Sequence, residues 1–256
     1  MKEYVDPYIN RNTDVLKNLL GISDKAKLQE AETQFTGLAM RELAKNPIKG
    51  KFDFAHLCKI HEAIFKDVYE WAGSPRIINI EKPEMVLQGI SLEYSHCDEI
   101  QKKASMILTK MNAVDWNKLT LDEKAVELSK YMADLWKVHP FREGNTRTTV
   151  TFCCDFAESR GFGLDRNLFK DNSKYVRTAL VAASADFTYS EKYSCLGDKS
   201  QPEHLLKIVK NGLKQGWKQR QQTMGLKSLK KQKEKNKNSL GSKPEKQSAN
   251  KNRMER

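Results

Sequence analysis

With 256 residues, of which 39% are hydrophobic and 30% charged, the chain has the composition of a soluble globular protein. The formal net charge is +12, but residues 207–256 alone hold 16 Lys and Arg against 3 Asp and Glu. The basic character therefore belongs to the tail, and it gives no reason to class residues 1–206 as nucleic-acid binding.

No apolar run approaches the ~18 residues that a membrane-spanning helix needs. Residues 1–4 lack the apolar core of a signal peptide. The five cysteines include no Cys-x-x-Cys pair and no other metal-ligand spacing. We therefore expect a protein of the reducing cytoplasm without a membrane span.

The body is predicted to be almost entirely helical, because apolar residues recur at helical spacing along most of it. Taken in chain order, the predicted helices cover residues 14–20, 22–43, 54–69, 95–111, 123–138, 148–159, 172–183 and 203–222. From Gly225 onward the sequence is mostly Lys, Gln, Asn and Ser, which favours disorder. We therefore predict one domain over residues 1–222 and a basic disordered tail over residues 223–256.

Residues 76–87 break the helical pattern. Residues 76–80 and 85–87 are rich in β-branched and apolar side chains and flank a Lys82-Pro83 turn. This pattern predicts a small β-hairpin, which must rest on the helices because an isolated hairpin is marginal in water. Its edge could pair with an extended peptide. The alternative is a structural excursion that covers the core.

A polar sequence separates the two central predicted helices, and it reads His139-Pro140-Phe141-Arg142-Glu143-Gly144-Asn145-Thr146-Arg147-Thr148. Pro140 predicts that the first helix ends near His139. Gly144 permits a tight turn, and Asn145 is suited to cap the second helix. The amides at the start of that helix would then form an anion site.

The chemistry of these side chains suits phosphate transfer. An imidazole titrates near neutral pH, so His139 could accept a proton, although a single histidine at a helix end is often structural. Glu143 could hold a metal ion or be a surface acid. Arg147 could pair with phosphate, and Phe141 is predicted to anchor the loop in the core.

The pattern His-Pro-Phe-x-(Asp/Glu)-Gly-Asn-x-Arg resembles the signature of the Fic family, whose members mostly move AMP from ATP onto a protein hydroxyl. Tyr69-Glu70-Trp71-Ala72-Gly73 resembles the family segment that precedes a β-hairpin flap over the active site. The resemblance implies a mainly α fold, a helical bundle with this flap, and activity as a protein adenylyltransferase.

The resemblance also implies a role for each site residue. His139 would be the general base, Glu143 would hold Mg²⁺, and ATP would be the substrate. The phosphates would lie on Gly144, Asn145, Thr146 and Arg147. Tyr175 would lie near the adenine, although it could equally be a core tyrosine. A target protein with a Tyr, Ser or Thr hydroxyl would dock on the flap at Ile77, Ile78, Asn79 and Ile80.

Two positions depart from the fullest Fic pattern. Thr146 replaces a glycine and Val150 replaces an arginine. The family's inhibitory segment (Ser/Thr)-x-x-x-Glu-(Gly/Asn) has no convincing copy, and residues 95–99 come closest. The resemblance then implies a toxin that a small antitoxin protein restrains by supplying the inhibitory helix in trans.

The sequence leaves other functions open. A Fic-fold kinase would bind the nucleotide in reverse, although such proteins usually have Lys after Gly-Asn, where this chain has Thr146. A nonenzymatic protein could act through the basic tail. That tail could be a solvated appendage, could bind nucleic acid or an anionic surface, or could direct type IV secretion into other cells.

Overall fold

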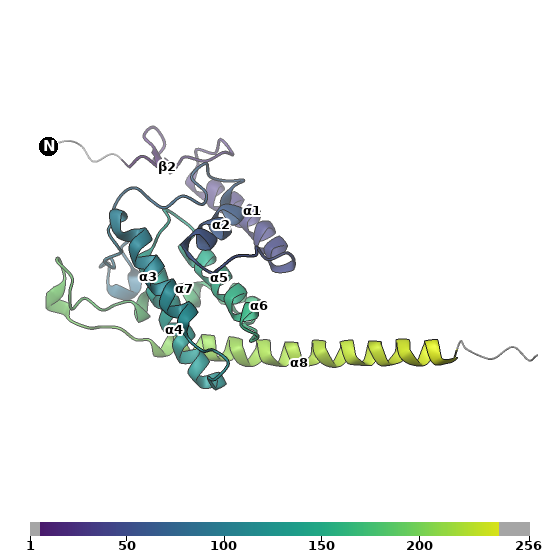
Figure 1. The fold of residues 1–256 in the computed structure, drawn as a ribbon. Helices are drawn as coiled ribbons and strands as arrows, with labels where there is room; N and C mark the ends of the chain where they lie inside the picture. The colour runs from purple at the N-terminus through teal and green to yellow at the C-terminus, as the bar shows by residue number, and fades with distance from the viewer. Residues whose placement is uncertain (1–5, 241–256) are drawn as a thin grey trace, which may run out of the picture. The chain divides into compact units, whose positions relative to one another are not determined.

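The computed structural model describes the backbone of residues 6–240 and the side chains of residues 6–224. Its architecture is mainly helical, as predicted (Figure 1). The α-helices are α1 (Lys25–Lys45), α2 (Phe54–Phe65), α3 (Ile100–Ala113), α4 (Leu121–Val138), α5 (Asn145–Ser159), α6 (Arg166–Asp171), α7 (Ser173–Ala183) and α8 (Glu203–Leu240). Short 3₁₀ turns occur at Met85–Leu87, Cys97–Glu99 and Ser194–Leu196.

Helices α4 and α5 form the centre of the fold and present the polar loop between them. A capping box starts α4: Thr120 Oγ1 accepts the Glu123 amide at 3.3 Å, and Glu123 Oε2 accepts the Thr120 amide at 2.8 Å. The helix ends at Val138, because His139 adopts the left-handed conformation at φ 50°. The position of this end agrees with the prediction from Pro140.

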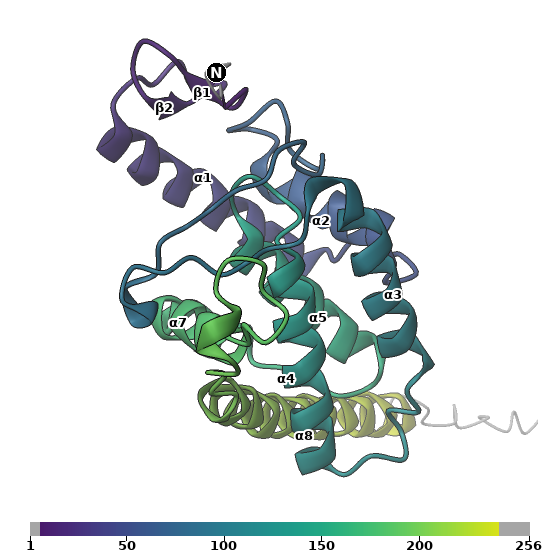
Figure 2. The ribbon, with the colours of Figure 1, turned by 90° about the vertical axis from the view of Figure 1, so that its left-hand side faces the viewer.

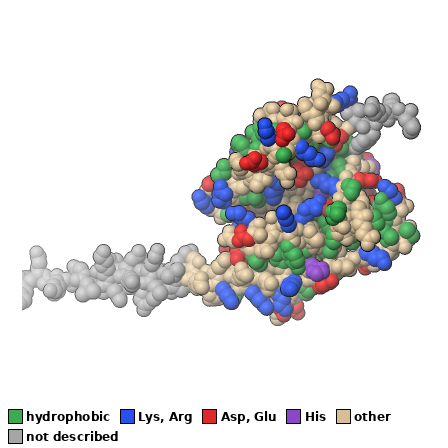
Figure 3. Space-filling view, turned by 180° about the vertical axis from the view of Figure 1, so that it is seen from behind, with side chains coloured by type: hydrophobic (Ala, Val, Ile, Leu, Met, Phe, Trp, Pro, Cys, Tyr) green, Lys and Arg blue, Asp and Glu red, His purple; other side chains and the backbone are tan. Residues whose placement is uncertain are grey.

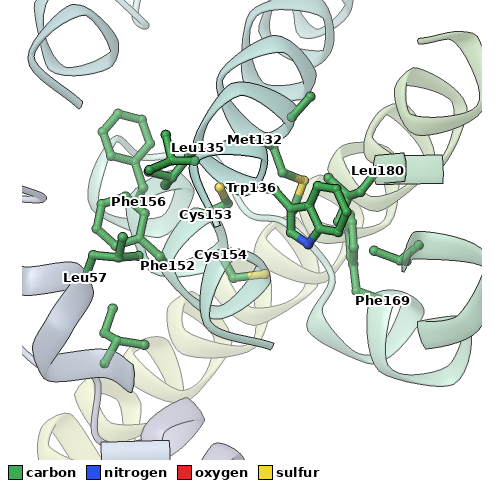
Figure 4. Packing of buried hydrophobic residues seen from close by; sticks show 14 of the residues in the cluster. Leu57, Met132, Leu135, Trp136, Phe152, Cys153, Cys154, Phe156, Phe169 and Leu180 are labelled. Carbon is green, nitrogen blue, oxygen red and sulfur yellow. The ribbon is translucent and has the colours of Figure 1, made fainter. Parts of the chain in front are cut away.

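The core packs around these two helices (Figure 4). Trp136 and Leu135 of α4, and Phe152 and Cys153 of α5, are fully buried. Cys153 and Cys154 therefore pack as small hydrophobic side chains, and burial raises the pKa of each thiol above its usual range. Helices α2, α3 and α7 pack against this pair and close the core.

The two-stranded antiparallel sheet lies near the N-terminus, at β1 (Ile9–Asn10) and β2 (Val15–Leu16), with Ile9 opposite Leu16. The predicted helix over residues 14–20 is therefore wrong. Asn10 Oδ1 accepts the Asn12 amide at 3.0 Å, and Asp14 has φ 53°, so the chain turns back here instead of coiling.

Residues 76–91, which we call the flap segment, do not form the predicted strands at 76–80 and 85–87. A single antiparallel bridge joins Pro83 to Ser91, and Met85–Leu87 is a 3₁₀ turn beside α7 (Figure 2). β-branched composition predicted strands here, but the backbone groups of this segment meet side chains and loops instead of a second strand. Within residues 6–240, the paired strands lie instead at residues 9–16.

The chain divides into two compact units, one at residues 1–217 and the other at residues 218–256. The backbone of α8 is helical through Leu240, beyond Gly225, where the sequence predicted disorder. Lys, Gln and Leu are good helix formers, which accounts for the continuation. The predicted disorder of residues 241–256 lies outside the described residues.

None of the helices within residues 6–240 combines the length and apolar character that crossing a bilayer requires. The face seen in Figure 3 is mixed in charge, with Lys and Arg side chains gathered across a hollow in its middle.

Candidate active site

The loop between α4 and α5 is shaped by a close approach at Gly144. This residue caps α5 with φ 82°, and a Cβ added there would lie 2.1 Å from Phe65 Cζ on α2. Only glycine allows both the left-handed backbone and this contact. The first amides of α5 have no acceptor within the helix, as at any helix start, so they are available to an anion.

Asn145 has a different role from the predicted one. Gly144, and not Asn145, is the N-cap, and the buried Asn145 side chain binds the backbone of Phe141 twice. Its Oδ1 accepts the Phe141 amide at 2.9 Å, and its Nδ2 donates to the Phe141 carbonyl at 2.7 Å. The Asn145 side chain thus fixes the loop, and its contribution to an anion site is its backbone amide.

Thr146 connects the two central helices. Its hydroxyl accepts the indole N–H of Trp136 at 2.9 Å, across from α5 to α4. The indole is buried, so this hydrogen bond satisfies a donor that would otherwise be unpaired. Thr146, which replaces a glycine of the fullest Fic pattern, therefore has a structural role here as the acceptor for Trp136.

His139 is buried directly beside the loop. Its ring stacks on Tyr94 with ring centres 3.9 Å apart, and it meets Trp136 edge-on. Among the described residues, neither ring nitrogen has a hydrogen-bond partner. Burial, with the positive charges of Lys82 and Arg76, holds the pKa of His139 well below its usual range. The imidazole is therefore neutral at pH 7, the form that can accept a proton.

Glu143 is ionised and already faces a cation. Its Oε1 accepts the Gly144 amide at 2.9 Å, and its Oε2 lies 3.2 Å from Lys82 Nζ of the flap segment. Burial opposes ionisation, but Lys82, the Gly144 amide and Arg147 outweigh it and lower the pKa of Glu143 to about 2. A carboxylate that is ionised and holds a cation fits an Mg²⁺ ligand.

Arg147 lies on the first turn of α5 and pairs with α1. Its guanidinium donates to Glu32 Oε1 at 2.5 Å and to Thr36 Oγ1 at 2.9 Å, and it stacks 4.8 Å from the Phe65 ring. Glu32 also accepts the buried Tyr69 hydroxyl. The sequence did not indicate Glu32 as a partner, because 115 residues separate it from Arg147.

Phe141 is fully buried, as predicted, and stacks on His61 with ring centres 3.8 Å apart. His61 Nδ1 accepts the Gly73 amide at 2.8 Å, so its Nε2 carries the proton and donates to the Glu143 carbonyl at 3.1 Å. Burial lowers the pKa of His61 to about 3, and the ring stays neutral. Sequence reasoning did not find His61 because α2 shows only an ordinary amphipathic pattern around it.

Arg76 was also missed as a positioning residue. Its side chain is buried, and it donates to the His139 carbonyl at 2.9 Å, to the Ile78 carbonyl at 2.6 Å and to the Ser95 carbonyl. Its amide donates to the Pro140 carbonyl at 2.8 Å. One guanidinium therefore fixes the flap segment, the chain before α3 and the end of α4 to one another.

The predicted docking residues line the start of the flap segment. Ile77 is 71% exposed, and Asn79 is exposed while its Oδ1 accepts the Cys97 amide at 2.9 Å. Ile78 and Ile80 are half-buried. Tyr175 lies on α7, and its hydroxyl donates to the His204 carbonyl on α8 at 3.3 Å. Its predicted place beside the adenine stays a prediction.

A cavity of about 630 Å³ lies beside Tyr94 and Val138 and does not reach residues 139–147. Tyr94 and Val138 line it on the side of the motif, and Asn79 and Ile80 line it from the flap segment. Other walls come from α3 and from the loop that holds Tyr189. Its walls carry both acidic and basic side chains, and residues 139–147 are not among them. The site predicted at residues 139–147 therefore lies outside this cavity.

The chain is similar to known Fic proteins. The family model described as Fic/DOC matches residues 51–157. The probable protein adenylyltransferase y4lH of Sinorhizobium fredii is 32% identical over 164 residues, which cover 63% of this chain and 80% of that protein. The chain belongs to the Fic/DOC family. The prediction drawn from residues 139–147 is confirmed at the level of the family.

Two further Fic proteins show how far the likeness reaches. The protein adenylyltransferase VbhT of Bartonella schoenbuchensis is 38% identical over 162 residues, which cover 62% of this chain but only 32% of VbhT. The chain therefore spans about a third of the length of this relative. The solved structure of BepC from Bartonella tribocorum, a VirB-translocated effector with bound AMPPNP, has 23% identity and a TM-score of 0.64, and it covers 80% of this chain and 95% of BepC. That likeness confirms the Fic fold.

Proposed function

We propose that this chain transfers AMP from ATP to a hydroxyl group of a target protein. The observation that carries the proposal is the loop itself. Gly144 caps the start of α5, and the neutral imidazole of His139 and the ionised carboxylate of Glu143 lie beside it. Helix-start amides suit the phosphates, the imidazole suits the hydroxyl proton and the carboxylate suits a cation. VbhT is a protein adenylyltransferase and y4lH is a probable one, which supports the same reaction here.

In the proposed step, the target hydroxyl oxygen attacks the α-phosphorus of ATP. A bond forms between that oxygen and the phosphorus, the bond to the bridging oxygen breaks, and pyrophosphate leaves with the electron pair. The hydroxyl proton passes to a ring nitrogen of His139. Neither Nδ1 nor Nε2 of this ring has a hydrogen-bond partner among the described residues. The amides of Asn145, Thr146 and Arg147 would stabilise the phosphate charge.

Mg²⁺ would be held by Glu143, and it would supply positive charge against the phosphates. Two hydrogen bonds hold Glu143 in place: the Gly144 amide donates to its side-chain Oε1, and His61 Nε2 donates to its backbone carbonyl. Arg147 would turn toward the outer phosphates from its position between Glu32 and Phe65. Tyr175 is proposed for the adenine, and its hydroxyl would then leave the His204 carbonyl on α8.

The target would dock at Ile77, Ile78, Asn79 and Ile80, whose segment Arg76 fixes to the carbonyl of His139. We further propose that regulation occurs in trans, by an inhibitory helix from a small antitoxin protein, because the sequence carries no convincing inhibitory segment of its own. The role would then be that of a toxin, or of an effector secreted into other cells by a type IV system, with the basic tail as a binding or secretion segment.

Labelled ATP tests the reaction and separates the alternatives. The protein is incubated with a bacterial lysate and with ATP labelled at the α- or the γ-phosphate. We expect protein-bound label from the α-phosphate alone, and no label with His139→Ala. Label from the γ-phosphate would instead indicate a kinase, and label from neither position would indicate a binding protein.

The exposed His96 provides the matched control, since His96→Ala removes an imidazole outside the loop. This variant should label as the parent does. If His139→Ala labelled equally well while keeping its circular dichroism spectrum, the assignment of the base would be wrong.

A further inference from the structure

Lys82 is the residue through which the flap segment reaches Glu143. Its Nζ lies 3.2 Å from Glu143 Oε2, and the two side chains are 23% and 33% exposed. The pair joins residues separated by 61 positions in the chain. It therefore lies inside the site described above and at its solvent-facing edge.

The two oxygens of Glu143 are both occupied. Oε1 accepts the Gly144 amide at 2.9 Å, a contact that also shapes the turn before α5. Oε2 accepts no backbone amide and is therefore the oxygen that a metal ion would bind, but the Lys82 ammonium already contacts it. Since ammonium and a divalent cation are both attracted to the same carboxylate oxygen, they compete for it.

The backbone at Lys82 is fixed while its side chain is long and flexible. The Lys82 amide donates to Ser91 Oγ at 2.8 Å, and the next residue forms the bridge to Ser91. Glu84, two residues on, is buried and makes paired hydrogen bonds of 2.7 and 2.8 Å to Arg177 of α7. Removing the ammonium from Glu143 therefore needs only side-chain rotation and no movement of the flap backbone.

We propose that Lys82 is a built-in competitor for the metal, occupying the magnesium position on Glu143 until a metal–nucleotide displaces it. The inference rests on the proposed function in taking Glu143 as the metal ligand. Its consequence is that the protein without nucleotide binds divalent ions weakly, because each ion must first displace an ammonium. Lys82 thereby makes occupancy of Glu143 depend on the metal arriving with phosphates attached.

Metal binding without nucleotide tests the inference directly. Mn²⁺ is titrated into the full chain, and the free ion is measured by electron paramagnetic resonance. Lys82→Met should bind Mn²⁺ roughly two- to fivefold more tightly than the parent, a range that follows from the strength of partly exposed ion pairs. Lys82→Arg keeps the positive charge and should stay close to the parent.

Two controls make the result specific. Lys192 forms a more exposed pair with Glu81 at 3.2 Å, so Lys192→Met should leave Mn²⁺ affinity unchanged. Adding Glu143→Gln to Lys82→Met should remove the gain. The inference is overturned if Lys82→Met binds no more tightly than the parent, or if the gain persists without the Glu143 carboxylate. Because no ATP is present, failure here is distinct from failure of AMP transfer.

Discussion

At the scale of single residues, Gly144 shows how a small side chain determines the geometry of the site. Its left-handed backbone turns the chain from the loop into α5, and its missing Cβ lets Phe65 lie against the turn. The same turn brings the Gly144 amide onto Glu143. The carboxylate and the helix-start amides are thus oriented by one residue.

We expect Gly144→Ala to lower the free energy of unfolding by more than about 2 kcal/mol, because it adds steric overlap to backbone strain. Urea unfolding followed by circular dichroism measures this. Gly89 is a matched control, since it has φ 86° and nothing within 4 Å of an added Cβ. Gly89→Ala should cost about 1 kcal/mol from strain alone. Equal losses in the two variants would contradict the role given to the Phe65 contact.

The residues that the sequence revealed are those that lie close together along the chain. His139, Glu143 and Gly144 fall within six consecutive positions, and their chemistry can be read from spacing alone. Glu32, His61 and Arg76 join the site through tertiary contacts, so no local pattern distinguishes them. Asn145 was found, but its side-chain role was not, because it depends on how the loop curls back on Phe141.

At the scale of elements, the flap segment is held by side chains instead of by strand pairing. Arg76 anchors its start to the end of α4, and Glu84 anchors its middle to Arg177 of α7. Glu84 is buried with 5% of its side chain exposed, so its carboxylate depends on this partner.

Arg177→Met should therefore destabilise the protein by about 1–3 kcal/mol, because it leaves a buried carboxylate without its partner. Thermal unfolding measures the loss. The pair between Lys192 and Glu81 provides the comparison, with side chains 57% and 68% exposed. Lys192→Met should cost less than about 0.5 kcal/mol. If Arg177→Met cost no more stability than Lys192→Met, the buried Glu84 carboxylate would not depend on the Arg177 guanidinium.

The helices were predictable because each buries one face, and burial leaves a period of 3.6 in the sequence. The exceptions are the shortest elements. Residues 14–20 form a hairpin strand and a loop, and residues 76–87 form an extended loop with one bridge, although both carry enough apolar residues to suggest regular structure. Their conformations depend on Asx turns and on hydrogen bonds to residues far away in the sequence, and neither can be predicted from amino-acid composition.

At the scale of the whole molecule, two buried histidines link folding to pH. Burial lowers the pKa of His61 to about 3 and holds the pKa of His139 well below its usual range. The unfolded chain therefore binds protons at these two sites near pH 6.5, while the folded protein does not. Stability should fall as the pH drops below 6.5 and continue to fall toward the folded pKa values.

We expect the free energy of unfolding to be about 2 kcal/mol lower at pH 5.5 than at pH 7, since each histidine contributes about 1 kcal/mol over this range. The low pKa of Glu143 adds its own loss of stability only below about pH 4.5, outside this window. Urea unfolding at the two pH values measures the difference. A protein equally stable or more stable at pH 5.5 would contradict the neutral, buried state of these rings.

The central claim is that the amides at the start of α5 hold the phosphates of ATP within reach of His139. A crystal structure with magnesium and a non-hydrolysable ATP analogue tests it most directly. We predict phosphate oxygens within hydrogen-bond distance of the amides of residues 145–147, the metal on Glu143, and the Lys82 ammonium withdrawn from that carboxylate. A nucleotide bound elsewhere, for example in the cavity behind Tyr94, with the loop unoccupied, would contradict the account.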